Sequence, residues 1–204
     1  MRFISHQFSI LLLECLDDHF DIKNMHRVKS IKTPFLNIGN KAVTKADAFV
    51  FSNEKELQIY YELQDSYKAK GILMITTSVD GKQWTKPEVA LEENFHLSFP
   101  NVFCMDGKMW MIPESYMVNQ VRLYEGHCDT GRFEMKSVLL DGDKFVDSFV
   151  YKKSDVYYLF TSIIYSDQSY DLKLFYSDFL WEGMLNIRCL QFHTGRLTRE
   201  MLGV

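Results

Sequence analysis

The chain has 204 residues, enough for one substantial hydrophobic core, so we expect a single domain over residues 1–204. Hydrophobic residues make up 47% of the chain, which argues against disorder, and aromatic residues make up 15%, which favours many short strands over a helix bundle. The net charge is −4 and no stripe of Lys or Arg runs along the sequence. We therefore expect no nucleic-acid partner.

One apolar run stands out near the N-terminus, at residues 8–13, and Glu14, Asp17 and Asp18 end it. The run is too short to span a bilayer, and no small-residue cleavage site follows it. It predicts a short amphipathic helix or a core strand in preference to an export signal. No other segment approaches transmembrane length, so we expect no membrane span.

An internal repeat of just under fifty residues dominates the remainder of the chain. An aromatic residue closes each unit, at Trp84, Phe133 and Trp181, with steps of 133 − 84 = 49 and 181 − 133 = 48. Each unit opens with a similar apolar run, and a second strand is expected after it; the runs are 47–51, 100–104 and 147–151, and the second strands are 57–62, 108–114 and 156–161. Short β-runs with a period of roughly 40–50 residues are typical of propeller blades.

The repeat predicts an all-β fold, a β-propeller of the five-bladed type, with three clear blades over residues 45–185. Residues 1–44 are expected to be an irregular segment or a partial blade, and residues 186–204 a second partial blade. Three blades with partial ends do not close such a ring. Two alternatives stay open: the propeller is incomplete, or a partner chain or a homo-oligomer covers the open blade edges.

The four cysteines, Cys15, Cys104, Cys128 and Cys189, form no C-x-x-C pair, and no His lies at metal-ligand spacing from them. We therefore expect no metal and no cofactor. Cys104 lies within an apolar run and is expected to be a buried free thiol. Reduced cysteines favour a cytoplasmic localisation.

Polar residues at symmetric positions of the repeat indicate where a site could lie. Asp47 and Asp147 begin the innermost strand of units one and three, and Pro100 has this place in unit two. Innermost strands of a propeller line its central channel, so both carboxylates could converge there. An Asp at the start of a strand also often caps a turn or accepts backbone hydrogen bonds, and this structural interpretation is equally open.

The second strands add further polar residues near the same predicted funnel. Glu62 and Glu114 end this strand in units one and two, Thr161 has the equivalent place in unit three, and His96 lies just before unit two. Carboxylates at strand ends are commonly solvated, and a loop His is more often hydrogen-bonded than catalytic. The aromatic residues expected around the funnel are Tyr61, Phe99, Trp110 and Tyr116.

Glycoside hydrolysis requires two carboxyl groups on opposite sides of a cleft, because one must be protonated and the other ionised. Aromatic rings beside them give the faces of the sugar a surface on which to stack. The catalytic version of this hypothesis makes Asp47 the base or nucleophile and Glu114 the acid, while Asp147 raises the pKa of the acid. The residues predicted to bind substrate are Glu62, His96, Tyr61 and Trp110.

Several short motifs together resemble a known family: Ala46-Asp47, Tyr61-Glu62, Asp80-Gly81-x-x-Trp84, His96-Leu97-Ser98-Phe99-Pro100, Met111-Ile112-Pro113-Glu114-Ser115, Val121-Arg122-Leu123-Tyr124, Asp147-Ser148 and Tyr158-Leu159-Phe160. They resemble the five-bladed propeller domain found N-terminally in plant glucosamine inositolphosphorylceramide transferases. In bacteria this domain occurs alone or attached to formyltransferase-like proteins of surface-polysaccharide clusters. It is more distantly similar to glycosidase propellers of the arabinanase and levansucrase clan.

This resemblance implies a carbohydrate-related role, and it places the family's polar positions at Asp47, Glu62, His96, Glu114 and Asp147. We predict a glycosidase-like propeller in surface-polysaccharide or glycoconjugate metabolism. Its partner in the central funnel would be a saccharide, a sugar nucleotide or a lipid-linked glycan. The alternative is a non-catalytic glycan-binding or assembly module that serves a glycosyltransferase. Whether the domain is an enzyme stays open at this point.

Overall fold

The computed structural model describes residues 10–15, 25–31, 43–53, 55–65, 70–127, 130–180 and 188–191. Contacts between Cα atoms divide the chain into two compact units, Met1–Pro100 and Asn101–Val204. Each unit is described by itself. The single domain expected over residues 1–204 stays a prediction.

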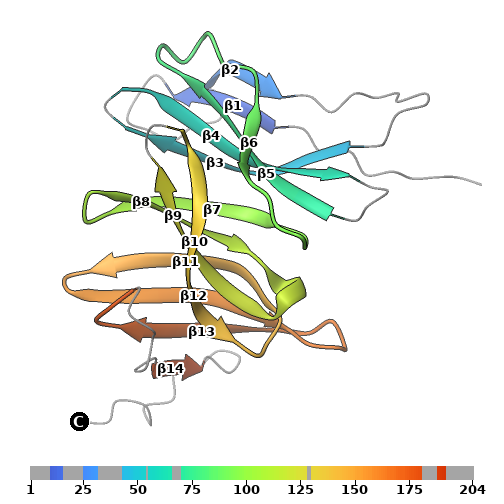
Figure 1. Ribbon diagram of the computed structural model, residues 1–204, viewed down its shortest axis with the longest axis vertical. Helices are drawn as coiled ribbons and strands as arrows, with labels where there is room; N and C mark the ends of the chain where they lie inside the picture. The colour runs from blue at the N-terminus through green and yellow to red at the C-terminus, as the bar shows by residue number, and fades with distance from the viewer. Residues whose placement is uncertain are drawn as a thin grey trace, which may run out of the picture. The chain divides into compact units, whose positions relative to one another are not determined.

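Unit 1 contains one two-stranded ribbon and one four-stranded antiparallel sheet (Figure 1). The ribbon pairs β1 (Ile10–Cys15) with β2 (Met25–Ile31), and the sheet runs in chain order through β3 (Val43–Ser52), β4 (Leu57–Asp65), β5 (Lys70–Ser78) and β6 (Glu88–Leu91). The N-terminal apolar run thus enters a strand and not a helix. A sheet whose neighbours are also consecutive in the chain is the arrangement of a propeller blade.

The ribbon packs on this sheet through a hydrophobic cluster. Its buried members are Ile31, Ile59, Tyr61 and Met74, and Ile10, Leu12, Leu63, Ile72 and Trp84 pack against them. The indole Nε1 of Trp84 donates to the carbonyl oxygen of Gly81, which ties the aromatic ring to the preceding turn. Trp84 therefore packs within the blade, as the repeat predicts.

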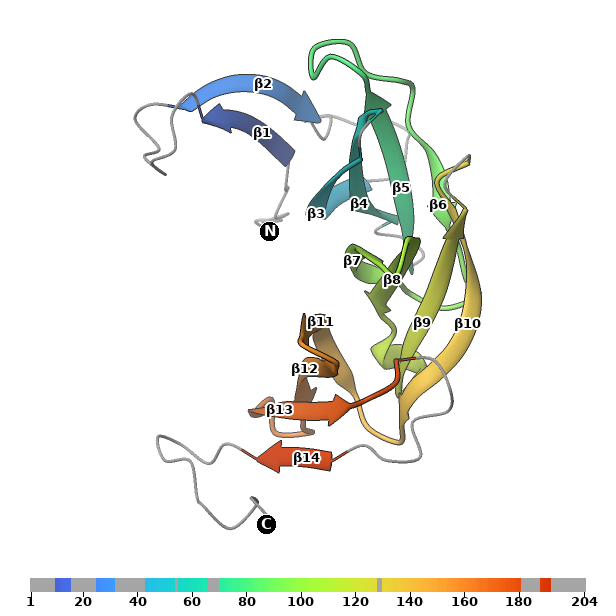
Figure 2. The ribbon, with the colours of Figure 1, turned by 90° about the vertical axis from the view of Figure 1, so that its left-hand side faces the viewer.

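Unit 2 contains two sheets with the same meander order (Figure 2). The first sheet consists of β7 (Ser98–Met105), β8 (Lys108–Glu114), β9 (Gln120–His127) and β10 (Arg132–Asp141). The first three residues of β7 belong to unit 1. The second consists of β11 (Phe145–Lys153), β12 (Val156–Ile164), β13 (Tyr170–Ser177) and β14 (Arg188–Gln191). A 3-10 turn, η2 (Tyr116–Val118), joins β8 to β9.

The two sheets of unit 2 share one core, and β11 contacts β8 and β9. The buried members of the core are Met105, Trp110, Ile112, Val121, Leu123, Leu139, Leu140, Phe145, Tyr157, Leu159, Ile163 and Leu180. Burial of apolar side chains between the sheets is what stabilises this unit, at roughly 25 cal/mol for each Å² removed from water.

The structure confirms the all-β fold and the three predicted second strands, which are β4, β8 and β12. Of the other aromatic residues expected to close a unit, Phe133 is buried in unit 2, whereas Trp181 lies outside the described residues. The partial blades predicted at residues 1–44 and 186–204 are described only where β1, β2 and β14 form. No helix of the described segments is long and apolar enough to cross a membrane.

The first strand of each four-stranded sheet contains a residue in the left-handed conformation. The residues are Asp47 (φ 50°), Phe99 (φ 46°) and Asp147 (φ 53°). The pairing register shifts at this point between Ala46 and Phe49 and again between Val146 and Phe149, as expected for a β-bulge.

Phe99, and not Pro100, is therefore the counterpart of the two aspartates. A bulge inserts one residue that an apolar pattern does not reveal, so aligning the apolar runs gives a register that is wrong by one. The bulge also changes which residue of the third repeat corresponds to Glu62 and Glu114 at the end of the second strand. Glu62 follows Asp47 by 15 residues and Glu114 follows Phe99 by 15, so the equivalent residue after Asp147 is Ser162 and not Thr161.

Cys104 is a free thiol, but its side chain is exposed, which corrects the expected burial. Its neighbour Met105 is buried, because successive side chains of a strand point to opposite faces. Cys104 lies on the face of β7 that the core of unit 2 does not cover.

Replacing Leu123 by Ala tests the core of unit 2. Leu123 is completely buried, so the Leu123→Ala variant should lose about 2–5 kcal/mol of unfolding free energy through lost burial and a new cavity. Leu172→Ala is the control, because Leu172 lies on β13 with 48% of its surface exposed. Urea denaturation followed by tryptophan fluorescence measures both variants, and equal losses in the two would contradict the assigned core.

Candidate functional site

In unit 1, the structure brings three of the predicted site residues into one cluster. The side chain of Asp47 is exposed, and its Oδ2 accepts a hydrogen bond from the backbone N–H of Phe99 at 3.2 Å. Glu62 Oε1 lies 3.6 Å from Nε2 of His96. Glu62 stands on β4 directly opposite Ala46, the neighbour of Asp47, so the strand pairing itself places the cluster.

The imidazole of His96 is held by the backbone of β5. Nδ1 of His96 accepts a hydrogen bond from the N–H of Gly71 at 2.9 Å, and Gly71 O accepts one from the N–H of Leu97 at 3.1 Å. Burial lowers the pKa of His96 below its usual value, while the carboxylate of Asp47 acts in the opposite direction. The neutral imidazole that accepts from Gly71 is therefore the favoured form.

Gly71 leaves no room for a side chain. A Cβ atom built there would collide with Leu97 O, would lie 2.5 Å from Glu62 Oε1 and would lie 3.0 Å from Cε1 of His96. Since real Cβ atoms do not approach other atoms this closely, glycine is what allows β5, Glu62 and His96 to meet.

In unit 2, the structure brings Glu114 and Asp147 together at a cavity of about 620 Å³. The lining residues are Glu114, Tyr116, Lys144, Val146, Asp147, Ile164, Tyr165, Ser166, Gln168 and Tyr170. The backbone N–H of Asp147 donates to Oε2 of Glu114 at 3.2 Å. Glu114 is half-buried at the end of β8, and Asp147 is exposed at the bulge of β11.

The turn between β12 and β13 forms one wall of this cavity. Tyr165 N–H donates to Ser169 O and Gln168 N–H donates to Tyr165 O, with Gln168 in the left-handed conformation (φ 65°). The hydroxyl of Tyr165 donates to Oδ2 of Asp171 at 3.0 Å, and this hydrogen bond raises the pKa of Tyr165 above its usual value.

Asp171 also receives the ammonium of Lys173 at 3.1 Å, and the Lys173 side chain is nearly buried. The Asp171 side chain is 37% exposed, so the pair is shielded from water on the Lys173 side only. The hydrogen bond to Asp171, which Lys173 also contacts, orients the ring of Tyr165 at the cavity.

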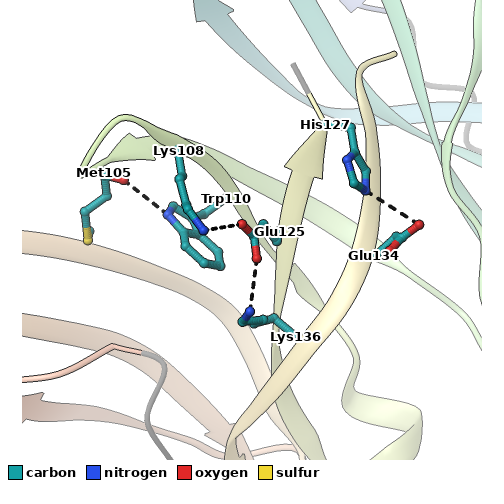
Figure 3. Close-up of polar contacts among 7 residues, drawn as sticks. All are labelled: Met105, Lys108, Trp110, Glu125, His127, Glu134 and Lys136. Carbon is teal, nitrogen blue, oxygen red and sulfur yellow. Dashed lines mark hydrogen bonds and ion pairs between the residues drawn. The ribbon is translucent and has the colours of Figure 1, made fainter. Parts of the chain in front are cut away.

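Of the aromatic residues predicted to bind substrate, Tyr61 is 1% exposed and Trp110 is 2% exposed, so both rings lie in the hydrophobic cores. Burial raises the pKa of Tyr61. The indole Nε1 of Trp110 donates to Met105 O at 3.3 Å (Figure 3). Neither ring presents a face to solvent in this structure, and their assignment to substrate stays a prediction.

A second polar group lies beside Trp110. Glu125 accepts from the ammonium groups of Lys108 at 2.6 Å and Lys136 at 3.2 Å, and these lysines lower the pKa of the carboxyl (Figure 3). Lys108 also lies 5.9 Å from the centre of the Trp110 ring. The adjoining cavity is only about 150 Å³, which suits a surface ion-pair network better than a saccharide site.

Among the residues that the structure describes, no group of three or more His, Cys, Asp or Glu side chains is arranged to hold a metal ion.

Residues 33–184, well over half of the chain, match the family described as Glucosamine inositolphosphorylceramide transferase 1, N-terminal. The chain belongs to this family. The family resemblance predicted from the sequence motifs is thereby confirmed.

Two curated relatives carry the name of the family. Glucosamine inositolphosphorylceramide transferase 1 of Arabidopsis thaliana is 30% identical over 129 residues, which cover 63% of this chain and 17% of that protein. The protein of the same name from Oryza sativa subsp. indica is 28% identical over 118 residues, which cover 57% of this chain and 16% of that protein. The chain thus matches a small part of these longer relatives.

Solved structures show the fold. The exo-beta-1,3-galactanase 1,3Gal43A from Clostridium thermocellum matches with a TM-score of 0.65 and 18% identity, covering 91% of this chain and 47% of that chain. Bacteroides ovatus Xyloglucan PUL GH43B matches with a TM-score of 0.59 and 15% identity, covering 88% of this chain and 38% of that chain. The family member described here is a carbohydrate-related β-propeller, as predicted, while the number of its blades stays a prediction.

Sequence reasoning did not find most residues that line the cavity in unit 2. Lys144, Tyr165, Gln168 and Tyr170 come from the ends of β11, β12 and β13 and from the turn between the last two. Tyr116 was predicted only as a neighbour of the funnel. The sequence of the turn between β12 and β13 does not recur in the other units, so comparing the units could not single out its residues.

The buried His96 predicts a dependence of stability on pH. The unfolded chain binds a proton on this residue at a higher pH than the folded chain does, so stability should decline as the pH falls below about 6.5. The loss should reach about 1.4 kcal/mol for each unit by which the pKa is lowered. Thermal unfolding at several pH values between about 7.5 and 5.5 measures it.

His96→Asn should show a smaller loss over this range, because the titrating group has been removed. His127→Asn is the matched control, since the His127 side chain on β9 is 54% exposed. A wild-type curve that is flat over the same range would contradict a neutral, buried His96.

Proposed function

We propose that this propeller binds a saccharide in the cavity of unit 2. The observation that carries the proposal is the combination of two carboxylates with three tyrosines around about 620 Å³, a volume suited to small ligands. Carboxylates accept hydrogen bonds from sugar hydroxyls, and tyrosine rings offer both an apolar face and a polar tip. Glu114 and Asp147 are the proposed acceptors, and Tyr165 and Tyr170 are the proposed rings.

Family membership supports this proposal, because the name of the family refers to glucosamine. The structural neighbours add that the same fold occurs in a galactanase. Chemistry at the cavity supports it independently, since Tyr165 is held in place by Asp171 and Lys173. A fixed ring loses less conformational entropy when a ligand binds.

The catalytic version of the proposal is glycosidase-like. It keeps Asp47 as base or nucleophile, Glu114 as acid and Asp147 as the group that raises the pKa of the acid. Glu62 and His96 are then residues of the saccharide site. In this version the domain acts within surface-polysaccharide or glycoconjugate metabolism, in the cytoplasm.

The second candidate is a non-catalytic glycan-binding or assembly module that serves a glycosyltransferase. The description of the family as the N-terminal part of a transferase favours it. In that case the ligand is a saccharide, a sugar nucleotide or a lipid-linked glycan, and a partner chain or a second copy covers the blade edges. The two candidates differ in whether any product appears.

Saccharide binding should depend on the two acids at the cavity. Glu114→Gln and Asp147→Asn remove one negative charge each and keep the volume, so each should weaken binding by about 10-fold or more, the equivalent of about 1.4 kcal/mol. Isothermal titration with arabinohexaose, a β-1,3-linked galacto-oligosaccharide, a xyloglucan oligosaccharide and glucosamine measures the affinity.

Glu134→Gln is the control, because this side chain lies on β10, is 80% exposed and is absent from the cavity lining. It should bind as the wild type does. If none of the four probes binds the wild-type chain, or if all three variants bind equally well, the cavity is not a saccharide site of this kind.

Turnover separates the two candidates. The catalytic version predicts that the wild type releases reducing ends from a bound oligosaccharide and that Asp47→Asn and Glu114→Gln each abolish the release, with thermal stability close to that of the wild type. Binding without any release would support the assembly module and would end the catalytic version. Release that persists in both variants would show that the assigned roles are wrong.

A further inference from the structure

We propose that His96 and Glu62 are positioning residues for Asp47, which act through Gly71 and the backbone of residues 96–99. The proposal deepens the proposed function by giving these two residues an indirect role at Asp47. It rests on that function only where the Asp47 carboxylate acts on a saccharide. The physical claim itself is a relay of contacts within unit 1.

The first step of the relay joins His96 to β5. Nδ1 of His96 accepts from Gly71 N–H at 2.9 Å, while Gly71 O accepts from Leu97 N–H at 3.1 Å. One glycine thus contributes its donor and its acceptor to two consecutive residues of the segment. These two bonds fix the segment against the end of β5 at which the strand begins.

The second step carries this anchor to Asp47. Phe99 follows two residues after Leu97, takes the left-handed conformation (φ 46°) and donates its N–H to Asp47 Oδ2 at 3.2 Å. Its ring meets the ring of Phe49 edge to face, with centroids 4.9 Å apart. A bulky residue seldom adopts a positive φ, so the surrounding contacts must hold Phe99 there.

Glu62 completes the relay from the other side of the imidazole. Its Oε1 lies 3.6 Å from Nε2 of His96, which favours the tautomer that carries its proton on Nε2 and leaves Nδ1 free to accept from Gly71. The contact depends on Gly71, because a Cβ there would lie 2.5 Å from the same carboxylate oxygen.

Burial separates the positioning role from direct contact with a ligand. The side chains of His96 and Glu62 are 10% and 9% exposed, and Leu97 is completely buried. Asp47, by contrast, is exposed. The relay therefore runs from buried groups to one accessible carboxylate, as in sites whose reactive group is oriented by a supporting layer.

Nuclear magnetic resonance tests the relay on the whole chain without any saccharide. Labelling with 13C-carbonyl Ser and 15N Phe selects Ser–Phe pairs, of which the sequence has two, Ser98-Phe99 and Ser148-Phe149. The variant Phe149→Leu assigns the two signals. The amide proton of Phe99 should resonate downfield of an amide bonded to a neutral acceptor, because it donates to a carboxylate.

Asp47→Asn identifies the part of this downfield displacement that the Asp47 carboxylate causes, since that part should vanish. His96→Ala should lose it as well, because Phe99 is no longer held on Asp47. His96→Asn keeps an acceptor near the Nδ1 position and should retain it, whereas His96→Gln places its amide near the Nε2 position and should lose it. The Asn and Gln variants are matched in polarity, but only Asn can replace the contact of Nδ1 with Gly71, and only Gln can replace that of Nε2 with Glu62.

Retention in Asn together with loss in Gln and Ala would support the relay. Equal behaviour of Asn and Gln, or an unchanged Phe99 signal in the Ala variant, would overturn it. If His96→Ala does not fold, the Asn and Gln pair still decides. A further measurement needs no variant: the 15N shifts of His96 must show an unprotonated Nδ1 near neutral pH, and a protonated Nδ1 would also overturn the relay.

Saccharide titrations on the same samples keep this result apart from the proposed function. The chain could pass the nuclear magnetic resonance test and still bind none of the four probes. In that case the positioning of Asp47 would stand, and its proposed role at a saccharide would be wrong. Saccharide binding that is unchanged by His96→Ala, in a sample whose Phe99 amide has lost its downfield displacement, would show that binding does not need the relay.

Discussion

The backbone amide of the left-handed residue within the first strand of a sheet is the constraint on which the rest of the arrangement depends. At a β-bulge this N–H leaves the regular ladder, and an amide without a partner costs free energy. In both units a carboxylate accepts it: Asp47 receives the amide of Phe99, and Glu114 receives the amide of Asp147. Both acids are therefore part of the hydrogen bonding of the strands.

A structural and a functional role of Asp47, which the sequence left as alternatives, are compatible in this position. Asp47 satisfies a backbone donor and is exposed, so it can stabilise the strand and still meet a ligand. The residues around Asp47 differ in burial. His96, Glu62 and Gly71 are buried and hold the backbone of residues 96–99, whereas the carboxylate of Asp47 is exposed. In unit 2, Asp171 and Lys173 support Tyr165 in a comparable way at the wall of the cavity.

Most of the sheet architecture follows from local sequence. The dipeptide Asp106-Gly107, with φ values of 52° and 75°, forces the hairpin between β7 and β8, and apolar runs place the flanking strands. The β-bulges could not be predicted from the sequence, because each adds one residue without changing the apolar pattern. Tyr61 and Trp110 were expected at the site because an aromatic ring suits a core and a sugar equally well, and only packing decides between them. The wall at Tyr165 and Tyr170 depends on how a turn folds back, which no repeat encodes.

The left-handed residue within the first strand of each four-stranded sheet has a consequence for how this fold can diverge. Asp and Asn adopt that conformation more readily than most other residues, and they differ by one charge. At Asp47 and Asp147 a single exchange between them could thus switch the local electrostatic field while the chain path stays the same. Phe99 shows that the position also admits an apolar ring when enough neighbours restrain it. Homologous blades could therefore carry an acidic, a neutral polar or an apolar side chain at this position without any change of architecture.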